Sequence, residues 1–228
     1  FPNHIPNPED KQAGASISKA VLDAKADLGI IFDTDVDRAG AVDAQGRVIN
    51  RNRLIALIGK ILLLEFPGTT IVTDSTTSSG LAKFIEANGG VHHRFKRGYK
   101  NVINEAIRLN KEGVNCPLAI ETSGHAALRE NYFLDDGAYL AVKLVIAVAK
   151  AKREGKTIDH FIANLCTEYA DREVRFPILT DDFHAYGTSV LETFKKRALQ
   201  SGFELPKSYE GIRIRFSGVC TGWMLLSR

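Results

Sequence analysis

The sequence "TTIVTDSTTSSGLAKFIEANGGVHHRF", Thr69–Phe95, contains two predicted strands separated by a predicted helix. The first strand is rich in β-branched residues, and the helix ends at Gly89 and Gly90, a residue type that commonly ends helices. A helix over residues 99–113 and a strand over residues 116–124 continue the alternation. This order predicts an α/β fold, in which mixed or mostly parallel sheets are covered by helices.

Further elements are predicted on both sides of this stretch. Hydrophobic periodicity predicts helices over residues 16–25, 52–66, 135–155, 155–170 and 184–202. Short apolar or β-branched runs predict strands over residues 28–32, 172–178, 209–217 and 222–228. Because Met224 is the single methionine and no initiator methionine is present, we expect a multi-domain fragment of a longer protein, with a partial α+β C-terminal domain.

The composition argues against several classes of function. The 30 basic and 27 acidic residues give a net charge of +3, too small to predict binding to nucleic acid or to a membrane surface. No apolar run approaches the roughly 20 residues that a membrane-spanning helix needs. The three cysteines form no CxxC pair, which favours a reducing compartment over a disulfide framework. We expect a cytoplasmic or organellar protein, with a plastid included, because any targeting segment would precede residue 1.

The segment "LGIIFDTDVDR", Leu28–Arg38, places three aspartates directly after an apolar strand. Asp33, Asp35 and Asp37 alternate along the chain, and alternate residues of an extended segment point the same way. Their mutual repulsion is costly unless a cation neutralises it, and three hard oxygen ligands suit Mg²⁺. The adjacent Arg38 suits a phosphate group. The segment therefore predicts a metal and phosphate site.

Two other interpretations of this acidic segment stay open. A solvent-exposed acidic turn needs no ligand at all. The segment also resembles that of haloacid-dehalogenase-like phosphatases, in which Asp33 would be the nucleophile and Asp35 the general acid and base. An EF-hand is disfavoured, because its loop requires glycine and glutamate where this chain has Arg38 and Ala44.

A second polar segment, "ETSGH" at Glu121–His125, also follows an apolar strand. It is expected at a sheet edge, where α/β proteins bind ligands. Glu121 can accept hydrogen bonds from two adjacent sugar hydroxyls, Ser123 and His125 can add to them, and Gly124 allows a close approach of the backbone. A polar loop with a structural histidine is the plainer alternative.

Together, "DTDVDR" and "ETSGH", about ninety residues apart, resemble the metal loop and the sugar loop of the α-D-phosphohexomutases, the phosphoglucomutase and phosphomannomutase superfamily. The segments "FPNHIPNPED" and "LDDGAYLAVKLV" are similar to flanking segments of the same family. The resemblance implies that the three aspartates bind Mg²⁺ and that Arg38 lies near a phosphoserine. It also implies that Glu121, Ser123 and His125 hold the sugar hydroxyls.

The segment "RFKRGYKNV" resembles the basic turn of this family. The resemblance implies that Gly98 and Lys100 lie near the transferred phosphate, with Lys96 and Arg97 assisting. A solvated basic turn is the alternative. Three threonines depart from the family's usual pattern: Thr34, Thr76 and Thr122. Some members carry a lysine at the position of Thr76.

The resemblance assigns residues 1–50 to the end of the family's second domain, 51–155 to the third and 156–228 to the start of the fourth. The implied activity is the interconversion of hexose 1-phosphate and hexose 6-phosphate, with glucose or mannose phosphate as substrate. It uses Mg²⁺, a phosphoserine and a hexose 1,6-bisphosphate intermediate. No serine loop precedes the acidic segment, so the chain is expected to be inactive without its missing N-terminal and C-terminal domains. The alternatives are a haloacid-dehalogenase-like phosphatase and a non-catalytic module that binds sugar phosphates.

Overall fold

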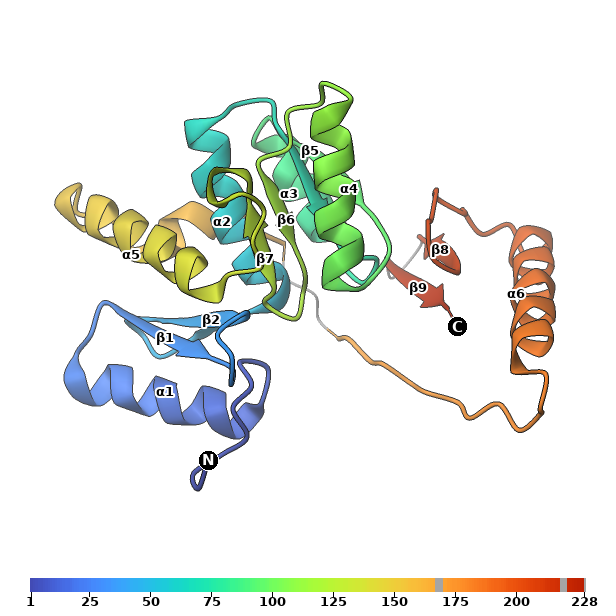
Figure 1. Ribbon diagram of the computed structural model, residues 1–228, viewed down its shortest axis with the longest axis horizontal. Helices are drawn as coiled ribbons and strands as arrows, with labels where there is room; N and C mark the ends of the chain where they lie inside the picture. The colour runs from blue at the N-terminus through green and yellow to red at the C-terminus, as the bar shows by residue number, and fades with distance from the viewer. Residues whose placement is uncertain (167–169, 218–220, 228) are drawn as a thin grey trace. The chain divides into compact units, whose positions relative to one another are not determined.

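The chain forms two compact units, Phe1–Cys166 and Thr167–Arg228, each described here by itself. The structure is a computed structural model that describes residues 1–166, 170–217 and 221–227 (Figure 1). Within these ranges no helix is both long and apolar enough to cross a lipid bilayer. Cys116 is buried and Cys166 is exposed, while Cys220 lies outside the described residues.

The first unit begins with a small antiparallel sheet. Its elements are α1 (Lys11–Ala24), β1 (Leu28–Phe32), β2 (Ala39–Asp43) and β3 (Val48–Ile49), with the strand order β1-β2-β3. Helix α1 begins before the predicted residue 16, because the side chain of Asp10 accepts hydrogen bonds from two amides of the first turn. Strand β2 was not among the predicted strands. It is fully buried and pairs along its whole length with β1.

A larger sheet and its helices make up the rest of the first unit. The elements are α2 (Arg51–Glu65), β4 (Thr70–Thr73), α3 (Ser79–Ala87), β5 (Val91–Arg94), α4 (Tyr99–Lys111), β6 (Leu118–Ile120), β7 (Ala126–Leu128), η1 (Arg129–Asn131), α5 (Gly137–Arg153) and η2 (Ile158–Ile162). The strand order is β5-β4-β6-β7, in which β7 alone is antiparallel to its neighbour. The sheet is mixed and flanked by helices, which confirms the predicted fold class.

Alternation along the strands gives this sheet two buried faces. Ile71 and Leu118 belong to the core formed with α2, α3 and α5, whereas Val72 and Ala119 belong to the core formed with α4. Successive strand residues point to opposite faces, so a fully apolar strand can serve both layers. Each buried Leu or Ile contributes about 1.5–3 kcal/mol. The result is three layers of helix, sheet and helix, visible in Figure 1.

Two predicted elements were wrong, one at the end of the first unit and one at the start of the second. The helix predicted over residues 155–170 is, where described, only the short 3₁₀ helix η2; residues 167–169 of that prediction lie outside the described residues. Ile158 and Ile162 nevertheless pack in the main core, so the first unit extends to this segment. The strand predicted over residues 172–178 is not formed, because a strand needs a partner edge and none of the described strands pairs with it. The division into domains stays a prediction.

The second unit consists of one helix and one hairpin. Helix α6 (Phe183–Gln200) packs against β8 (Ile212–Phe216), which pairs in antiparallel fashion with β9 (Gly222–Leu226). On the hairpin the guanidinium of Arg213 lies 3.8 Å from the ring centroid of Trp223, in a cation–π contact between the two strands. This arrangement agrees with the predicted α+β character of the C-terminal part.

Candidate functional site

The sugar loop predicted at residues 121–125 leaves the sheet where the strand order reverses. From β4 the chain runs outward to β5 and then returns to β6 on the other side of β4. Ligands of open α/β sheets bind at the carboxyl ends of the strands at such a point. Asp74 follows β4 directly and Glu121 follows β6 directly. The loop itself is a tight turn in which the amide of Glu121 donates to the carbonyl of His125 over 2.9 Å.

The acidic loop connects β1 to β2 and is shaped by its own first and last residues. The amide of Arg38 donates to Oδ1 of Asp33 over 3.1 Å, and the guanidinium Nε of Arg38 donates to Oδ2 over 2.7 Å. Asp33 is buried, and burial by itself raises the pKa of its carboxyl group. The hydrogen bonds from Arg38 outweigh the effect of burial, so the pKa of Asp33 is lowered overall. Asp33 is therefore held as an anion at the base of the loop.

The two loops, distant in sequence, meet backbone to backbone. The amide of Ala39 donates to the carbonyl of Gly124 over 3.3 Å, and Arg38 pairs with His125 in an isolated antiparallel bridge. Gly124 has a φ of +98°, and a Cβ at this position would lie 2.8 Å from the carbonyl oxygen of Ala39. Only glycine fits this crossing. The predicted metal loop and the predicted sugar loop thus lie in direct contact.

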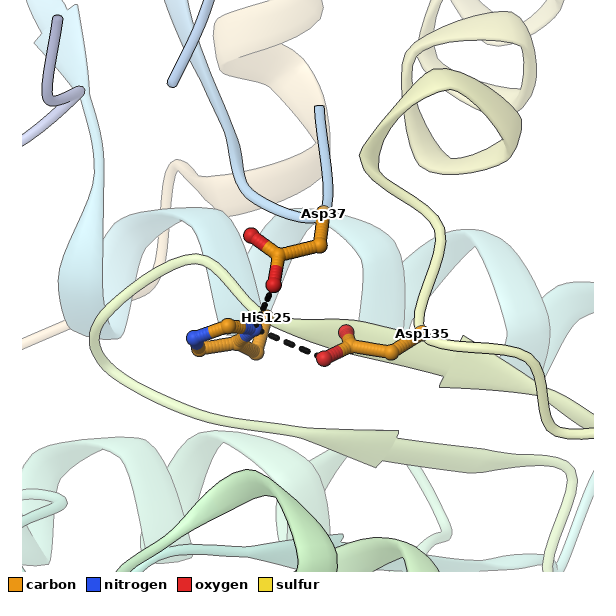
Figure 2. Close-up of side chains that lie close together, drawn as sticks. All are labelled: Asp37, His125 and Asp135. Carbon is orange, nitrogen blue, oxygen red and sulfur yellow. Dashed lines mark hydrogen bonds and ion pairs between the residues drawn. The ribbon is translucent and has the colours of Figure 1, made fainter. Parts of the chain in front are cut away.

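His125 is held by two carboxylates from different elements. Its Nδ1 lies 2.8 Å from Oδ2 of Asp135 and 3.6 Å from Oδ2 of Asp37, and Figure 2 shows the two acids approaching the ring. Burial opposes protonation of the ring, but the bond to Asp135 and the charges of both acids outweigh it and raise the pKa of His125. The ring of Tyr99 also stacks on His125, with the centroids 5.0 Å apart.

The acidic loop fits a hard cation. Asp33, Asp35 and Asp37 each offer a carboxylate oxygen, and these ligand atoms lie within 4.8 Å of one another. Oδ1 of Asp37 is buried and has no hydrogen-bond partner within the described part of the chain. Burial and the neighbouring Asp33 carboxyl raise the pKa of Asp37, as expected of a buried acid beside a like charge. A set of oxygen ligands of this kind suits Mg²⁺.

Glu121 joins the sugar loop to the basic turn. It is buried, and its Oε1 accepts a hydrogen bond from the amide of Gly98 over 2.5 Å. Burial raises the pKa of Glu121, although the bond from Gly98 opposes the shift. The hydroxyl of Ser123 lies 3.4 Å from Oε2 of Glu121. The structure therefore brings Glu121, Ser123 and Gly98 together.

The remaining basic residues lie on the exposed surface of the turn before α4. Lys96, Arg97 and Lys100 are exposed. Arg97 is near enough to lower the pKa of Glu121, against the larger effect of burial. Gly98 has a φ of +110° at the N-terminal end of α4, a conformation that favours glycine. The turn presents positive charge at the edge of the site.

Sequence reasoning missed three residues of this site. Asp135 was predicted only as the first residue of a helix, but Asp136 caps α5 and Asp135 binds His125. Tyr99 was expected as an ordinary helix residue. Asp74 was seen only as the end of a strand. A signal was present for Asp74, because it follows β4 as Glu121 follows β6.

Comparison with known proteins identifies the family of the chain. Residues 50–169 match the family model for phosphoglucomutase/phosphomannomutase alpha/beta/alpha domain III, and residues 1–46 match the model for alpha/beta/alpha domain II. The model for domain III alone covers more than half of the chain.

Individual relatives carry related names. The phosphomannomutase/phosphoglucomutase of Pseudomonas aeruginosa is 28% identical over 227 residues, 99% of this chain and 46% of the relative. A phosphoglucosamine mutase of Limosilactobacillus fermentum is 32% identical over 155 residues, 67% of this chain and 32% of the relative. The crystal structure of a phosphoglucomutase/phosphomannomutase family protein from Burkholderia thailandensis aligns with a TM-score of 0.75 and 25% identity, over 94% of this chain and 43% of that one. The chain thus spans less than half the length of these relatives, and it belongs to the phosphoglucomutase/phosphomannomutase family, the α-D-phosphohexomutases.

Proposed function

We propose that this chain supplies the metal loop and the sugar loop of an enzyme that interconverts hexose 1-phosphate and hexose 6-phosphate. The observation that carries the proposal is the hydrogen bond from the amide of Ala39 to the carbonyl of Gly124. It holds an acidic loop with Mg²⁺-type ligands against a loop rich in donors and acceptors for sugar hydroxyls. Glucose and mannose phosphates are the expected substrates.

The acidic loop would hold the cation and one phosphate. Asp33, Asp35 and Asp37 would hold Mg²⁺, which supplies charge neutralisation on a phosphoryl group during transfer. Arg38 is fixed beside them through its Nε bond to Asp33, and we assign its guanidinium to the phosphate and the phosphoserine. Lys100, at the first turn of α4, is assigned to the transferred phosphate.

The other loops would bind the rest of the substrate. Glu121 accepts from sugar hydroxyls, Ser123 adds a donor, and His125, whose pKa is raised, donates. The exposed charges of Lys96 and Arg97 attract the distal phosphate, and the backbone of Gly98 connects this turn to Glu121. Contacts at several points would hold the sugar phosphate in the orientation that phosphoryl transfer requires.

The proposed reaction passes through hexose 1,6-bisphosphate and needs a phosphoserine, which we assign to the rest of the protein. We therefore propose that these 228 residues alone bind substrate without turning it over. We also propose that the whole protein works in the cytoplasm or in an organelle such as a plastid. The phosphatase alternative is disfavoured, because residues 1–46 and 50–169 match phosphoglucomutase/phosphomannomutase family models.

The test uses the full-length protein with Mg²⁺, hexose 1,6-bisphosphate and either glucose 1-phosphate or mannose 1-phosphate. Phosphorus NMR should show hexose 6-phosphate appearing, and EDTA should stop the reaction. Release of inorganic phosphate instead would favour a phosphatase. Binding of the phosphosugars without any conversion would favour a non-catalytic module, and either result would reject the mutase.

A further inference from the structure

Asp74 is a fully buried carboxylate one residue beyond the end of β4. Strand β6 pairs in parallel with β4, so Asp74 and Glu121 leave neighbouring strands at the same edge of the sheet. The strand order reverses between these two strands. Asp74 therefore lies at the binding edge of the sheet, although neither the acidic loop nor the sugar loop contains it.

The carboxylate of Asp74 accepts hydrogen bonds from two loops. Its Oδ1 accepts from the amide of Thr122 over 3.1 Å, and its Oδ2 accepts from the hydroxyl of Thr122 over 2.9 Å. In the loop before α3, the hydroxyl of Thr76 donates to the same Oδ2, and the amide of Thr76 lies 3.4 Å from it. The two threonine hydroxyl oxygens are 3.1 Å apart. Backbone and side-chain donors of both loops thus converge on one carboxylate.

These bonds are the means by which a buried charge is tolerated here. No ion pair reaches Asp74 from the residues that the structure describes. A carboxylate removed from water without a cation is costly, and charge-assisted hydrogen bonds offset that cost. Thr122 is bound through both its amide and its hydroxyl, so it has little freedom to rotate. Its neighbours on either side, Glu121 and Ser123, are residues assigned to the sugar.

We propose that Asp74 is a positioning residue of the mutase, which fixes Thr122 and thereby orients Glu121 and Ser123 toward the sugar hydroxyls. The inference rests on the proposed function and deepens it. Asp74 does not touch substrate in this proposal. It acts through the backbone of the sugar loop, and Thr76 locks the neighbouring loop to the same carboxylate.

The test compares variants of the full-length protein in steady-state kinetics with glucose 1-phosphate. Asp74→Asn places an amide group where four donors converge, and Thr122→Val removes one donor while keeping the volume of the side chain. Each should raise KM about tenfold with a much smaller change in kcat, because uniform binding of the sugar is lost. Thr122→Ser keeps the hydroxyl and should recover most of the affinity.

Thr69→Val is the matched control. Thr69, like Thr122, is a buried threonine, and it lies beside β4, but its hydroxyl has no partner in the described part of the chain. Its substitution should leave KM and kcat as they are.

If Asp74 and Thr122 serve stability alone, Thr122→Val would lower the melting temperature and the active fraction with KM unchanged, and the inference would be overturned. A wild-type protein without mutase activity would instead reject the proposed function, a result distinct from an active enzyme with insensitive variants. Should Asp74→Asn fail to fold, Thr122→Val and Thr122→Ser still decide.

Discussion

The amide nitrogen of Gly98 lies 2.5 Å from Oε1 of Glu121, so the basic turn before α4 is hydrogen-bonded to the buried carboxylate of the sugar loop. The two segments are assigned to the phosphate and to the sugar hydroxyls of one substrate. The buried side chain of Glu121 therefore connects both segments. Replacing Glu121 by glutamine measures how much its buried charge lowers the free energy of unfolding.

Glu121→Gln should stabilise the fold at neutral pH while weakening the binding of hexose phosphate about tenfold. Burial raises the pKa of Glu121 above its ordinary 4.5, so the folded protein binds this proton more tightly than the unfolded chain does. The stability that Glu121 contributes is present below the unfolded pKa and is lost as the pH rises through the folded pKa. Glutamine has no charge to bury. Urea denaturation should show the variant more stable than wild type near neutral pH, with a smaller difference at about pH 4.

Glu86→Gln is the control for this prediction, because Glu86 is exposed on α3. Glu86→Gln should leave both the free energy of unfolding near neutral pH and the affinity for hexose phosphate as they are in wild type. A less stable Glu121→Gln protein at neutral pH would show that the hydrogen bond to Gly98 outweighs the burial of charge.

Asp35→Asn should separate the metal from the fold. Asp35 is exposed and lies near two other carboxylates, so removing its charge relieves repulsion when no cation is present. In EDTA the melting temperature of the variant should equal or exceed that of wild type. Added Mg²⁺ should raise the melting temperature of wild type and have little effect on the variant, since ligands that bind only the folded state stabilise it. In the full-length protein, Mg²⁺-dependent turnover should be lost.

Asp23→Asn is the matched control, because Asp23 is an exposed aspartate on α1 paired with Lys19. It should keep the full response to Mg²⁺. An Asp35→Asn protein that responds to Mg²⁺ as wild type does and retains turnover would remove Asp35 from the metal site.

Gly124→Ala should disconnect the two loops. The added Cβ would lie 2.8 Å from the carbonyl oxygen of Ala39, and backbone atoms on both sides cannot yield easily. The positive φ adds strain of about 1–3 kcal/mol. Turnover of the full-length protein should fall by about a hundredfold, because small displacements of catalytic groups are costly.

Gly68→Ala controls for the backbone strain. Gly68 has a φ of +79°, and a Cβ there would meet nothing within 4 Å. This variant should lose about 1 kcal/mol of stability with unchanged kinetics. Equal kinetic losses in both variants would assign the effect to general destabilisation rather than to the crossing of the loops.

Glu105→Gln should reveal a pH dependence of the opposite sign, away from the site. Glu105 is buried, and two nitrogens of Arg108 each lie 2.8 Å from its oxygens. The hydrogen bond from Arg108 lowers the pKa of Glu105 below its ordinary 4.5, with His93 adding to the effect and burial opposing it. The stability contributed is present above the unfolded pKa and is lost as the pH falls through the folded pKa. Wild type should therefore exceed the variant in free energy of unfolding near neutral pH, and acid should narrow the difference. A difference that widens in acid would contradict the ion pair.

Much of the fold could be predicted because its strands and helices carry local signals. The run Ile71–Val72 and the helix ends at Gly89 and Gly90 are properties of neighbouring residues. Strands β2 and β7 were missed because "AGAV" and "AAL" consist largely of small residues without β-branched enrichment. They become strands through pairing with β1 and β6, respectively. Residues 172–178 show the reverse case, since their β-type composition forms no strand in the described ranges.

The candidate site divides in the same way. Asp33, Glu121 and Gly98 stand in recognisable short motifs. Asp74 follows a strand as Glu121 does, which indicates its sheet edge, but the sequence near Asp135 and Asp74 does not reveal that their partners are His125 and Thr122. Such contacts depend on which strand edges are brought together, a property of topology rather than of spacing.

The acidic loop is fastened at a further point, with a consequence for recombination between relatives. The amide of Gly137 donates to the carbonyl of Val36 over 3.0 Å, and a Cβ on Gly137 would lie 2.8 Å from that oxygen. A chimaera that exchanges only residues 1–46 would therefore seat its acidic loop on a foreign turn and a foreign helix start. Chimaeras that exchange residues 1–46 together with 121–140 keep the donor and acceptor backbones in their native combination. The segments that form this site are therefore separated along the chain. Hybrids that take residues 1–46 and 121–140 from the same parent are the ones expected to be active.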